Sequence, residues 1–171
     1  MADVTEKTAL TKSVPKRPHI IFICTGNLCR SPMAQGIFKA RWAALGHTNF
    51  TVSSMGIHGL DRQPATEFAR HICKHHGIDI SQHNSRPLQF EEMNQCDLIL
   101  TLEMAQKDFL LLLAPQLAEK VFLLGSWPNK DTPKGNIKDP MGGALKDYEN
   151  AYDTISRCID RILPYIQTLF K

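Results

Sequence analysis

The sequence predicts an α/β fold in a single domain: a four-stranded parallel sheet, doubly wound with helices on both faces. Three observations lead to this prediction. Four short apolar segments alternate with helix-length segments along the chain, and right-handed crossovers between parallel strands place each intervening helix against the sheet. The chain has 171 residues, a length that suits one domain. Its composition, 43% hydrophobic and 22% charged, is that of an ordinary globular protein.

The N-terminal segment differs from the rest of the chain. Residues 1–17 lack hydrophobic periodicity and contain Pro15, and Pro18 follows directly after them. They also lack the apolar core that a secretory signal needs. We therefore expect residues 1–17 to form a flexible tail and residues 18–171 to form the folded domain.

The first strand is predicted at residues 19–24, where the run HIIFIC is short, apolar and β-branched, as expected for a strand buried on both faces. Ser31 and Pro32 then supply the N-cap and the first-turn proline of a helix that continues to about Leu45. The residues between strand and helix form a tight turn.

The same alternation continues along the chain. FTVSS at residues 50–54 is the second predicted strand, and residues 64–76 are the second predicted helix. DLILTL at residues 97–102 predicts the third strand, and a helix begins near Glu103. The fourth strand is KVFLLG at residues 120–125.

The last helix is predicted from about Leu145, and Pro164 is expected to kink or end it. Apolar residues recur on one face of this helix at helical spacing: Tyr148, Tyr152, Ile155, Ile159 and Ile162. In open parallel sheets, ligands bind beyond the carboxyl ends of the strands, where the strand order reverses. The sequence places at that rim Cys24, Ser54, Thr101 and the loop after Gly125.

Charge and composition exclude several functional classes. The formal net charge of +3 is scattered along the chain, so we expect no nucleic-acid partner. The longest apolar run, residues 109–114, is too short to span a bilayer, so we expect no membrane insertion. Five cysteines give no even framework of disulfides. These features predict a cytoplasmic protein with free thiols, and a monomer is the expected state.

The histidines and the remaining cysteines give no sign of a metal. His71, His75 and His76 lack Cys or carboxylate ligands at paired spacing, so no metal site and no cofactor are predicted. Three cysteines at apolar-periodic positions or beside strands are predicted to pack in the core: Cys73, Cys96 and Cys158.

The turn after the first strand carries the chemistry. Cys24 ends the strand, and Arg30 follows six positions later at the start of the helix. A thiolate attacks a phosphate ester, and both a helix N-terminus and an adjacent arginine favour the ionised form of a cysteine. Arg30 also offers a planar fork for bidentate contact with phosphate oxygens.

The rest of the turn fits a phosphate-binding loop. Backbone amides curled around one centre bind phosphate oxygens, and the glycine permits the positive φ that such a curl needs. The predicted phosphate-binding residues are Thr25, Gly26, Asn27, Leu28, Cys29 and Arg30. In addition, the Asn27 amide is expected to brace the loop, and Ser31 to donate a hydrogen bond to the Cys24 sulfur.

This loop resembles that of the low-molecular-weight protein tyrosine phosphatase family, whose pattern is a cysteine, five residues and Arg-Ser, matched by CTGNLCRSPMA at residues 24–34. The resemblance covers almost the whole chain after the tail. Further matches are VSSMG at 52–56, GIDISQH at 77–83, DLILTLEM at 97–104, KVFLLGSW at 120–127 and KDPMGG at 138–143. It implies a metal-independent hydrolase that removes phosphate from phosphotyrosine through a phosphocysteine intermediate.

A phosphocysteine route needs a second group that protonates the leaving oxygen and then activates water. The segment from residue 125 to 143 is long for a loop in a compact domain, which points to function. Within it, Pro140 holds the preceding Asp139 in an extended conformation, and the resemblance implies that Asp139 is the general acid and base. Trp127 begins this loop and is a predicted substrate contact.

The resemblance also implies roles for residues around the loop. Cys29 matches a family cysteine that forms a reversible disulfide with the nucleophile. Ser54 and His83 match positions that orient the loop asparagine, although Ser53, beside Ser54, is an alternative.

The substrate indications are mixed. Met141, Gly142 and Gly143 follow the Asp-Pro pair, where typical tyrosine phosphatases of the family carry aromatic residues, and this resembles the protein arginine phosphatases. Leu28, by contrast, resembles the tyrosine-specific members, since the arginine phosphatases tend to have threonine there. Phosphotyrosine is the favoured substrate, with Leu28, Met141 and Trp127 as its predicted wall. The expected partners are phosphorylated proteins, with a tyrosine kinase of exopolysaccharide synthesis as a candidate.

Two other functions share parts of this pattern. A thioredoxin-coupled arsenate reductase uses the same loop but needs two further cysteines close together, and Cys73 and Cys96 are far apart in the sequence. A non-catalytic module that only binds phosphoproteins needs neither a nucleophile nor an acid. The presence of Cys24, Arg30 and Asp139 together therefore favours an enzyme.

Overall fold

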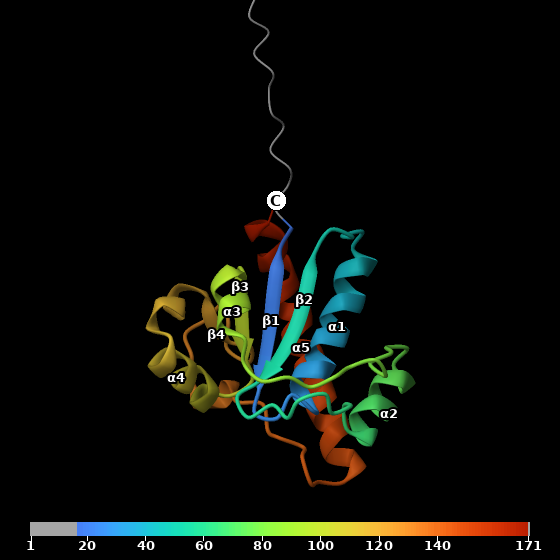
Figure 1. Cartoon of the computed structure of the whole chain (residues 1–171). Coiled ribbons are helices and arrows are strands. Elements are labelled where there is room, and N and C mark those ends of the chain that lie inside the picture. Colours follow the sequence, from blue (N-terminus) through green and yellow to red (C-terminus); the bar gives the residue numbers. More distant parts are fainter. Residues whose placement is uncertain (1–16, 171) are drawn as a thin grey trace, which may run out of the picture.

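The computed structural model describes residues 17–170, so residues 1–16 of the tail predicted for residues 1–17 lie outside the described residues. Arg17, at the end of the predicted tail, donates from Nη2 to the carbonyl of Phe50 at 3.0 Å. Four parallel strands form one sheet in the order β2-β1-β3-β4 (Figure 1). Their bounds are β1 His19–Cys24, β2 Thr51–Gly56, β3 Leu98–Thr101 and β4 Val121–Leu123.

Strand β1 lies between β2 and β3, so the chain moves to one side of β1 and then returns to the other. Ile20 pairs with Val52 of β2 and with Leu98 of β3, all in parallel register. The switch point of the sheet therefore lies beside β1, and Cys24 occupies the carboxyl end of that strand. The fold brings the cysteine to the place where such sheets bind ligands.

Helices cover both faces of the sheet, as the sequence predicted (Figure 1). Helices α1, α2 and α5 pack on one face, and α3 and α4 pack on the other. The helix bounds are α1 Arg30–Ala44, α2 Glu67–His75, α3 Phe90–Gln95, α4 Met104–Leu113 and α5 Leu145–Leu169. Two 3₁₀ turns, Pro115–Lys120 and Pro133–Gly135, complete the fold.

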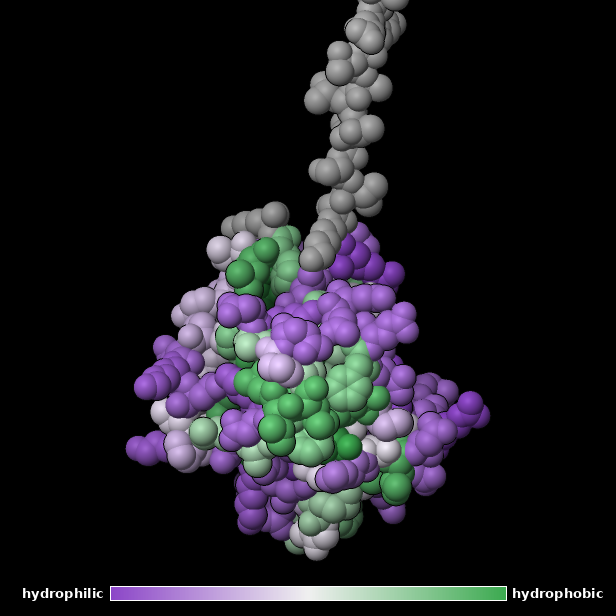
Figure 2. Space-filling view, turned by 60° about the vertical axis from the view of Figure 1, so that its left-hand side comes forward, coloured by the Kyte–Doolittle hydropathy of each residue, from purple (hydrophilic) through white to green (hydrophobic). Residues whose placement is uncertain are grey.

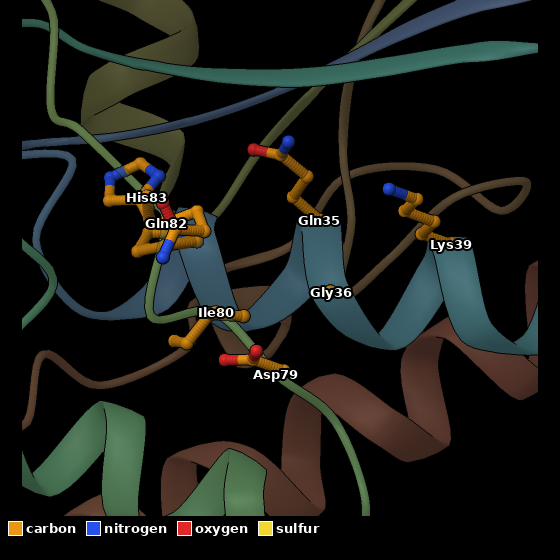
Figure 3. A pocket seen from close by; sticks show the side chains of 8 residues that line it. Gln35, Gly36, Lys39, Asp79, Ile80, Gln82 and His83 are labelled. Carbon is orange, nitrogen blue, oxygen red and sulfur yellow. The ribbon is translucent and has the colours of Figure 1, made fainter.

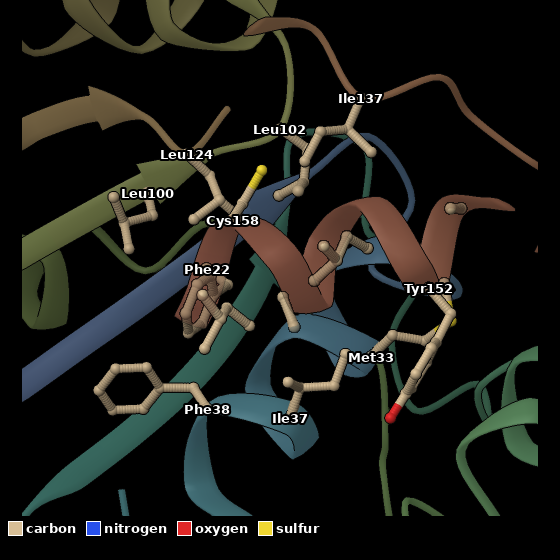
Figure 4. Packing of buried hydrophobic residues seen from close by; sticks show 14 of the residues in the cluster. Phe22, Met33, Ile37, Phe38, Leu100, Leu102, Leu124, Ile137, Tyr152 and Cys158 are labelled. Atoms are coloured by element: carbon tan, nitrogen blue, oxygen red, sulfur yellow. The ribbon is translucent and has the colours of Figure 1, made fainter. Parts of the chain in front are cut away.

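The apolar run of β1 serves two separate cores. Side chains alternate across a strand, so Ile20 and Phe22 face α1 and α5, while Ile21 and Ile23 face α3 and α4. Figure 4 shows Phe22 and Leu100 of the sheet gathered with residues of α1 and α5. All five residues predicted for the buried face of α5 are buried: Tyr148, Tyr152, Ile155, Ile159 and Ile162.

Two predictions about helix ends were wrong. Helix α1 begins at Arg30 with Cys29 at its N-cap, so Ser31 lies in the first turn and its hydroxyl faces Cys24 instead of capping the helix. The helix predicted at 64–76 begins at Glu67. Pro164, predicted to kink or end this helix, lies inside α5, which continues to Leu169, and Leu163 and Ile166 on either side of it are buried in the core.

One face of the molecule carries exposed apolar side chains. Leu112 and Leu113 at the end of α4 are exposed to 80% and 51%. Figure 2, which brings the α4 side of the molecule forward, shows apolar residues gathered among polar ones on that face. Within residues 17–170, no helix is both long and apolar enough to cross a bilayer.

Candidate active site

The predicted nucleophile lies at the junction of β1 and α1. Cys24 is 3% exposed, and its Sγ lies 3.0 Å from Oγ of Ser31. Ser31 reaches the sulfur because it is in the first turn of α1, directly after the loop that connects strand and helix. The sulfur therefore faces the N-terminus of a 15-residue helix, where the helix dipole favours negative charge.

Asn27 holds the shape of this loop. Its backbone has a φ of 55°, in the left-handed region that asparagine tolerates better than most residues, and its side chain is fully buried. Its Nδ2 donates to Oγ of Ser31 and to Oγ of Ser54, each at 2.9 Å. Its Oδ1 accepts from the backbone N–H of Arg86 at 3.0 Å. The asparagine is thus fixed from three sides.

The structure places Ser54, and not the alternative Ser53, beside the loop. Ser54 also donates from Oγ to Oε1 of Gln35 at 2.7 Å. His83 Nε2 lies 2.7 Å from the carbonyl oxygen of Asn27, and since a carbonyl only accepts, Nε2 carries the proton. Gln35 and His83 both line a cavity of about 190 Å³ behind the loop, between α1 and the segment after α2 (Figure 3).

Burial lowers the pKa of His83 below the usual 6.5, so this histidine is neutral in the folded protein at pH 7. The unfolded chain takes up a proton at about pH 6.5 while the folded protein resists it, so stability is lost as the pH falls below about 6.5. We expect the free energy of unfolding to fall less between pH 7 and pH 5 in His83→Asn than in the native chain. Urea unfolding at several pH values measures this, and equal slopes would contradict it.

Arg30 is 1% exposed and joins three segments of the chain. Its Nη2 donates to Oδ2 of Asp139 at 2.7 Å, and its Nη1 donates to the carbonyl of Ile137 at 2.7 Å and to Oε1 of Glu103. Its Nε is buried and has no hydrogen-bond partner among residues 17–170. One guanidinium therefore contacts two carboxylates and retains an unused buried donor.

Glu103 and Gln106 were missed in the sequence. Glu103 lies two residues after the end of β3 and ion-pairs with Arg30, and the only sequence signal for it was an acidic residue at the carboxyl rim of the sheet. Gln106 accepts at Oε1 from the backbone N–H of Leu102, and its Nε2 donates to Oγ1 of Thr25 at 3.2 Å. The start of α4 is thus tied to the loop that follows β1.

Two hydrogen bonds hold the loop that carries Asp139 against the residues that follow the carboxyl end of β3. The N–H of Ile137 donates to the carbonyl of Leu102 at 2.8 Å, and Oδ1 of Asn136 accepts from the N–H of Met104 at 2.7 Å. The Asp139 side chain is 42% exposed. The carboxylate therefore contacts both Arg30 and solvent.

Of the three residues predicted to form a substrate wall, Trp127 does not lie at the site. Its ring is 8% exposed and packs between Phe122 and Tyr165, with ring centroids at 5.5 and 6.3 Å. A large apolar ring in the turn after β4 is stabilised more by burial in this core than by exposure at the surface. Met141, whose N–H donates to Asp139 Oδ1, is 48% exposed, and Leu28 is half-buried at the loop.

Cys29 is enclosed by two hydroxyl groups. Its Sγ lies 3.4 Å from Oγ1 of Thr66 and 3.5 Å from the hydroxyl of Tyr148. Burial raises the pKa of the Cys29 thiol, although hydrogen bonds with Thr66 and Tyr148 lower it, so Cys29 is protonated at neutral pH. All five cysteines lie in the described part of the chain and are free and buried.

Comparisons with known proteins identify the family of this chain. The family model of the low molecular weight phosphotyrosine protein phosphatases matches residues 19–170. A probable low molecular weight protein-tyrosine-phosphatase, EpsP of Ralstonia nicotianae, is 35% identical over 150 residues, which are 88% of this chain and 97% of that protein. A protein-arginine-phosphatase of Geobacillus stearothermophilus is 30% identical over 149 residues, 87% of this chain and 96% of that protein.

A solved structure shares the fold as well. The low molecular weight protein tyrosine phosphatase from T. tengcongensis superposes with a TM-score of 0.80 at 34% identity, covering 86% of this chain and 99% of that chain. The sequence resemblance carried by the Cys24 loop is therefore confirmed by the matching family model. The chain belongs to the low molecular weight phosphotyrosine protein phosphatase family and is an enzyme of the protein-tyrosine-phosphatase class.

Proposed function

We propose that this phosphatase hydrolyses phosphotyrosine in proteins through a phosphocysteine on Cys24. In the first step the Cys24 thiolate forms a bond to phosphorus, the bond from phosphorus to the tyrosine oxygen breaks, and Asp139 gives its proton to that oxygen. In the second step Asp139 takes a proton from water, the water oxygen attacks phosphorus, and the phosphorus–sulfur bond breaks. Inorganic phosphate leaves and the thiolate is restored.

The observation that carries this proposal is the convergence on Arg30. The Arg30 guanidinium is adjacent to the proposed acid, with Nη2 2.7 Å from Asp139 Oδ2. Arg30 is also the first residue of α1, whose N-terminus faces the Cys24 sulfur. The buried and unpaired Nε of Arg30 is a donor that an oxygen of a bound phosphate would satisfy. The amides of residues 25–30 would supply further donors around the same centre.

Asp139 and Glu103 both contact the Arg30 guanidinium. Two carboxylates beside one buried cation keep that cation compensated before substrate arrives. The phosphate group of a substrate is itself a dianion and would compete with them for the same planar fork. We propose that Glu103 keeps the guanidinium oriented toward the loop while Asp139 performs the proton transfers.

The thioredoxin-coupled arsenate reductase is disfavoured by the positions of its required cysteines. Cys73 is buried on α2 and Cys96 lies beneath the opposite face of the sheet, so the two thiols belong to separate cores. Burial raises the pKa of Cys73 to about 12 and that of Cys96 to about 11. Two such thiols do not form the mobile, reactive pair that a relay of disulfides needs.

A protein arginine phosphatase is the second candidate, and the loop after Asp139 favours it. Met141 is exposed, and Gly142 has a φ of 77° with open space where a side chain would begin. No aromatic residue stands directly after the Asp-Pro pair, at residues 141–143, so those positions supply no stacking partner for a phosphotyrosine ring. Hydrolysis of phosphotyrosine and phosphoarginine peptides by one preparation separates the two candidates. A higher kcat/KM for phosphoarginine would overturn the proposed substrate.

Leu28→Thr tests how the loop selects its substrate. The Leu28 side chain is half-buried beside Gly26, with Cδ1 3.7 Å from the position of a Cβ there, so it borders the phosphate-binding loop. Replacing it with threonine removes apolar contact with a ring and adds a hydroxyl, a change of about 1–3 kcal/mol in discrimination. We expect kcat/KM for phosphotyrosine to fall and that for phosphoarginine to rise. An unchanged ratio of the two would show that Leu28 does not select the substrate.

The natural partners are proposed to be phosphorylated proteins, with a tyrosine kinase of exopolysaccharide synthesis as a candidate. The Asp139 side chain is partly exposed to solvent, so a phosphorylated side chain that projects from a protein surface could reach it. The redox role of Cys29 is also part of the proposal, since its thiol and Cys24 belong to the same loop and both are free.

A further inference from the structure

The shape of the phosphate-binding loop depends on how Asn27 is held. A residue with positive φ persists when its surroundings fix it, and Asn27 is fully buried with hydrogen bonds at both its amide and its backbone. Two of these bonds come from one segment, residues 83–86. His83 Nε2 lies 2.7 Å from the Asn27 carbonyl, and the N–H of Arg86 donates to Asn27 Oδ1 at 3.0 Å.

The Arg86 side chain fixes the place of that segment. Its Nε donates to the carbonyl of Ser54 at 3.0 Å, which ties it to β2. Its Nη1 and Nη2 donate to Oε2 and Oε1 of Glu92 at 2.6 and 2.9 Å, a bidentate pair. The two side chains are 31% and 26% exposed, so the pair is partly shielded from water.

Glu92 is itself held in place. It lies on α3, whose Met93 is buried in the core on that face of the sheet. Its Oε1 accepts from Oγ of Ser53 at 2.7 Å and lies 3.2 Å from Nε2 of His19. Hydrogen bonds from Arg86 and Ser53 hold the pKa of Glu92 below its usual range, so it is charged at neutral pH. The carboxylate thus offers Arg86 a fixed and charged partner.

Gly56, at the end of β2, contacts both the Arg86 backbone and the phosphate-binding loop. The N–H of Gly56 donates to the carbonyl of Arg86 at 3.0 Å. A Cβ on Gly56 would lie 2.8 Å from the carbonyl oxygen of Thr25 and 2.9 Å from the backbone nitrogen of Asn27. Backbone therefore packs on backbone here, with no side chain between them to absorb a shift of the segment.

We propose that Arg86 and Glu92 are positioning residues for the phosphate-binding loop: their bidentate pair sets the place of the Arg86 backbone, which holds Asn27 in its left-handed conformation. Neither residue contacts the Cys24 sulfur, and they act through Asn27. The inference rests on the phosphate-binding role proposed above for residues 25–30. Loss of the pair would let the amides of the loop move apart and would lower their affinity for a phosphate dianion.

The test measures phosphate affinity apart from turnover. Binding of inorganic phosphate is measured by calorimetry in the Cys24→Ser background, alone and combined with Arg86→Ala or Glu92→Gln. Small displacements of binding groups have large effects, so we expect each combination to weaken phosphate binding by roughly 10-fold or more. In the native Cys24 background, the same substitutions are expected to lower kcat/KM for p-nitrophenyl phosphate by a similar factor.

A matched control separates positioning from general stability. Arg41→Ala removes a comparable arginine–carboxylate contact, Arg41 Nε to Asp160 Oδ1 at 3.1 Å, between α1 and α5 and away from the loop. It should leave phosphate affinity unchanged. Arg86→Lys, which restores the charge but not the fork, should recover only part of the affinity. The amide signal of the Asn27 side chain in an NMR spectrum should shift in Glu92→Gln and stay in place in Arg41→Ala.

The outcomes are distinct. Should Arg86→Ala fail to fold, Glu92→Gln keeps the shape of the side chain and carries the test. If both variants bind phosphate within twofold of the control, or lose thermal stability with unchanged affinity, the inference is wrong. If the native chain does not bind phosphate at all, it is the proposed function of the loop that fails, whatever the variants do.

Discussion

Cys24→Ser is expected to abolish turnover while phosphate still binds. The hydroxyl of serine is not ionised at neutral pH and is a far poorer nucleophile than a thiolate. The amides of the loop, the bond network around Asn27 and the guanidinium of Arg30 remain in place, since none of them depends on the sulfur. Loss of a catalytic nucleophile lowers kcat by about 10⁴-fold or more. Turnover of p-nitrophenyl phosphate measures the loss, and calorimetry with phosphate or vanadate measures binding.

The control for this experiment is Cys29→Ser. Cys29 is in the same loop and is also buried, but its thiol faces Thr66 and Tyr148 instead of Ser31. We expect this variant to retain most of its activity under reducing conditions. Appreciable turnover by Cys24→Ser, or an equal loss in both variants, would contradict the covalent route through Cys24.

The strands were predictable because their signal is local. A run such as HIIFIC at 19–24 is apolar from Ile20 to Cys24, and a short apolar and β-branched run is typical of a strand covered on both faces. The turn from Cys24 to Arg30 could be located for a similar reason, because these residues lie within one short segment, and its phosphate-binding role stays a prediction. By contrast, α3 was not predicted: six residues, FEEMNQ, are too few to show a helical period. It is fixed by burial of Met93 and by the contact of Glu92 with Arg86.

The parts of the site that the sequence did not reveal come from distant segments. Glu103 and Arg86 meet the loop only because β3 and β2 flank β1, and sheet order is not written in any local pattern. Trp127 was misplaced for a related reason. An aromatic residue at the end of a strand has the same sequence signal whether it faces substrate or a neighbouring helix, and here α5 covers it.

Asp139→Asn is expected to lower kcat/KM for a phosphotyrosine peptide much more than for p-nitrophenyl phosphate. The tyrosine oxygen leaves with a pKa of about 10 and depends on a proton donor, whereas p-nitrophenolate leaves without one. Loss of a general acid lowers the rate of the step it assists by about 10²–10⁴-fold. The value of kcat/KM reports the steps up to departure of the leaving group. It therefore measures the role of Asp139 as an acid separately from its later role as a base.

The substitution is well suited to the site because asparagine keeps an oxygen for Arg30. Oδ2 of Asp139 accepts from Arg30 Nη2 and Oδ1 accepts from the N–H of Met141, and one of these bonds survives in the amide. Phosphate affinity should therefore change little. Asp131→Asn is the matched control. Asp131 lies in the same loop as Asp139 and forms an ion pair with Lys107 of α4, so its substitution should affect both substrates alike. An equal fall on both substrates in Asp139→Asn would remove Asp139 from the acid role, because the leaving-group pKa would then make no difference.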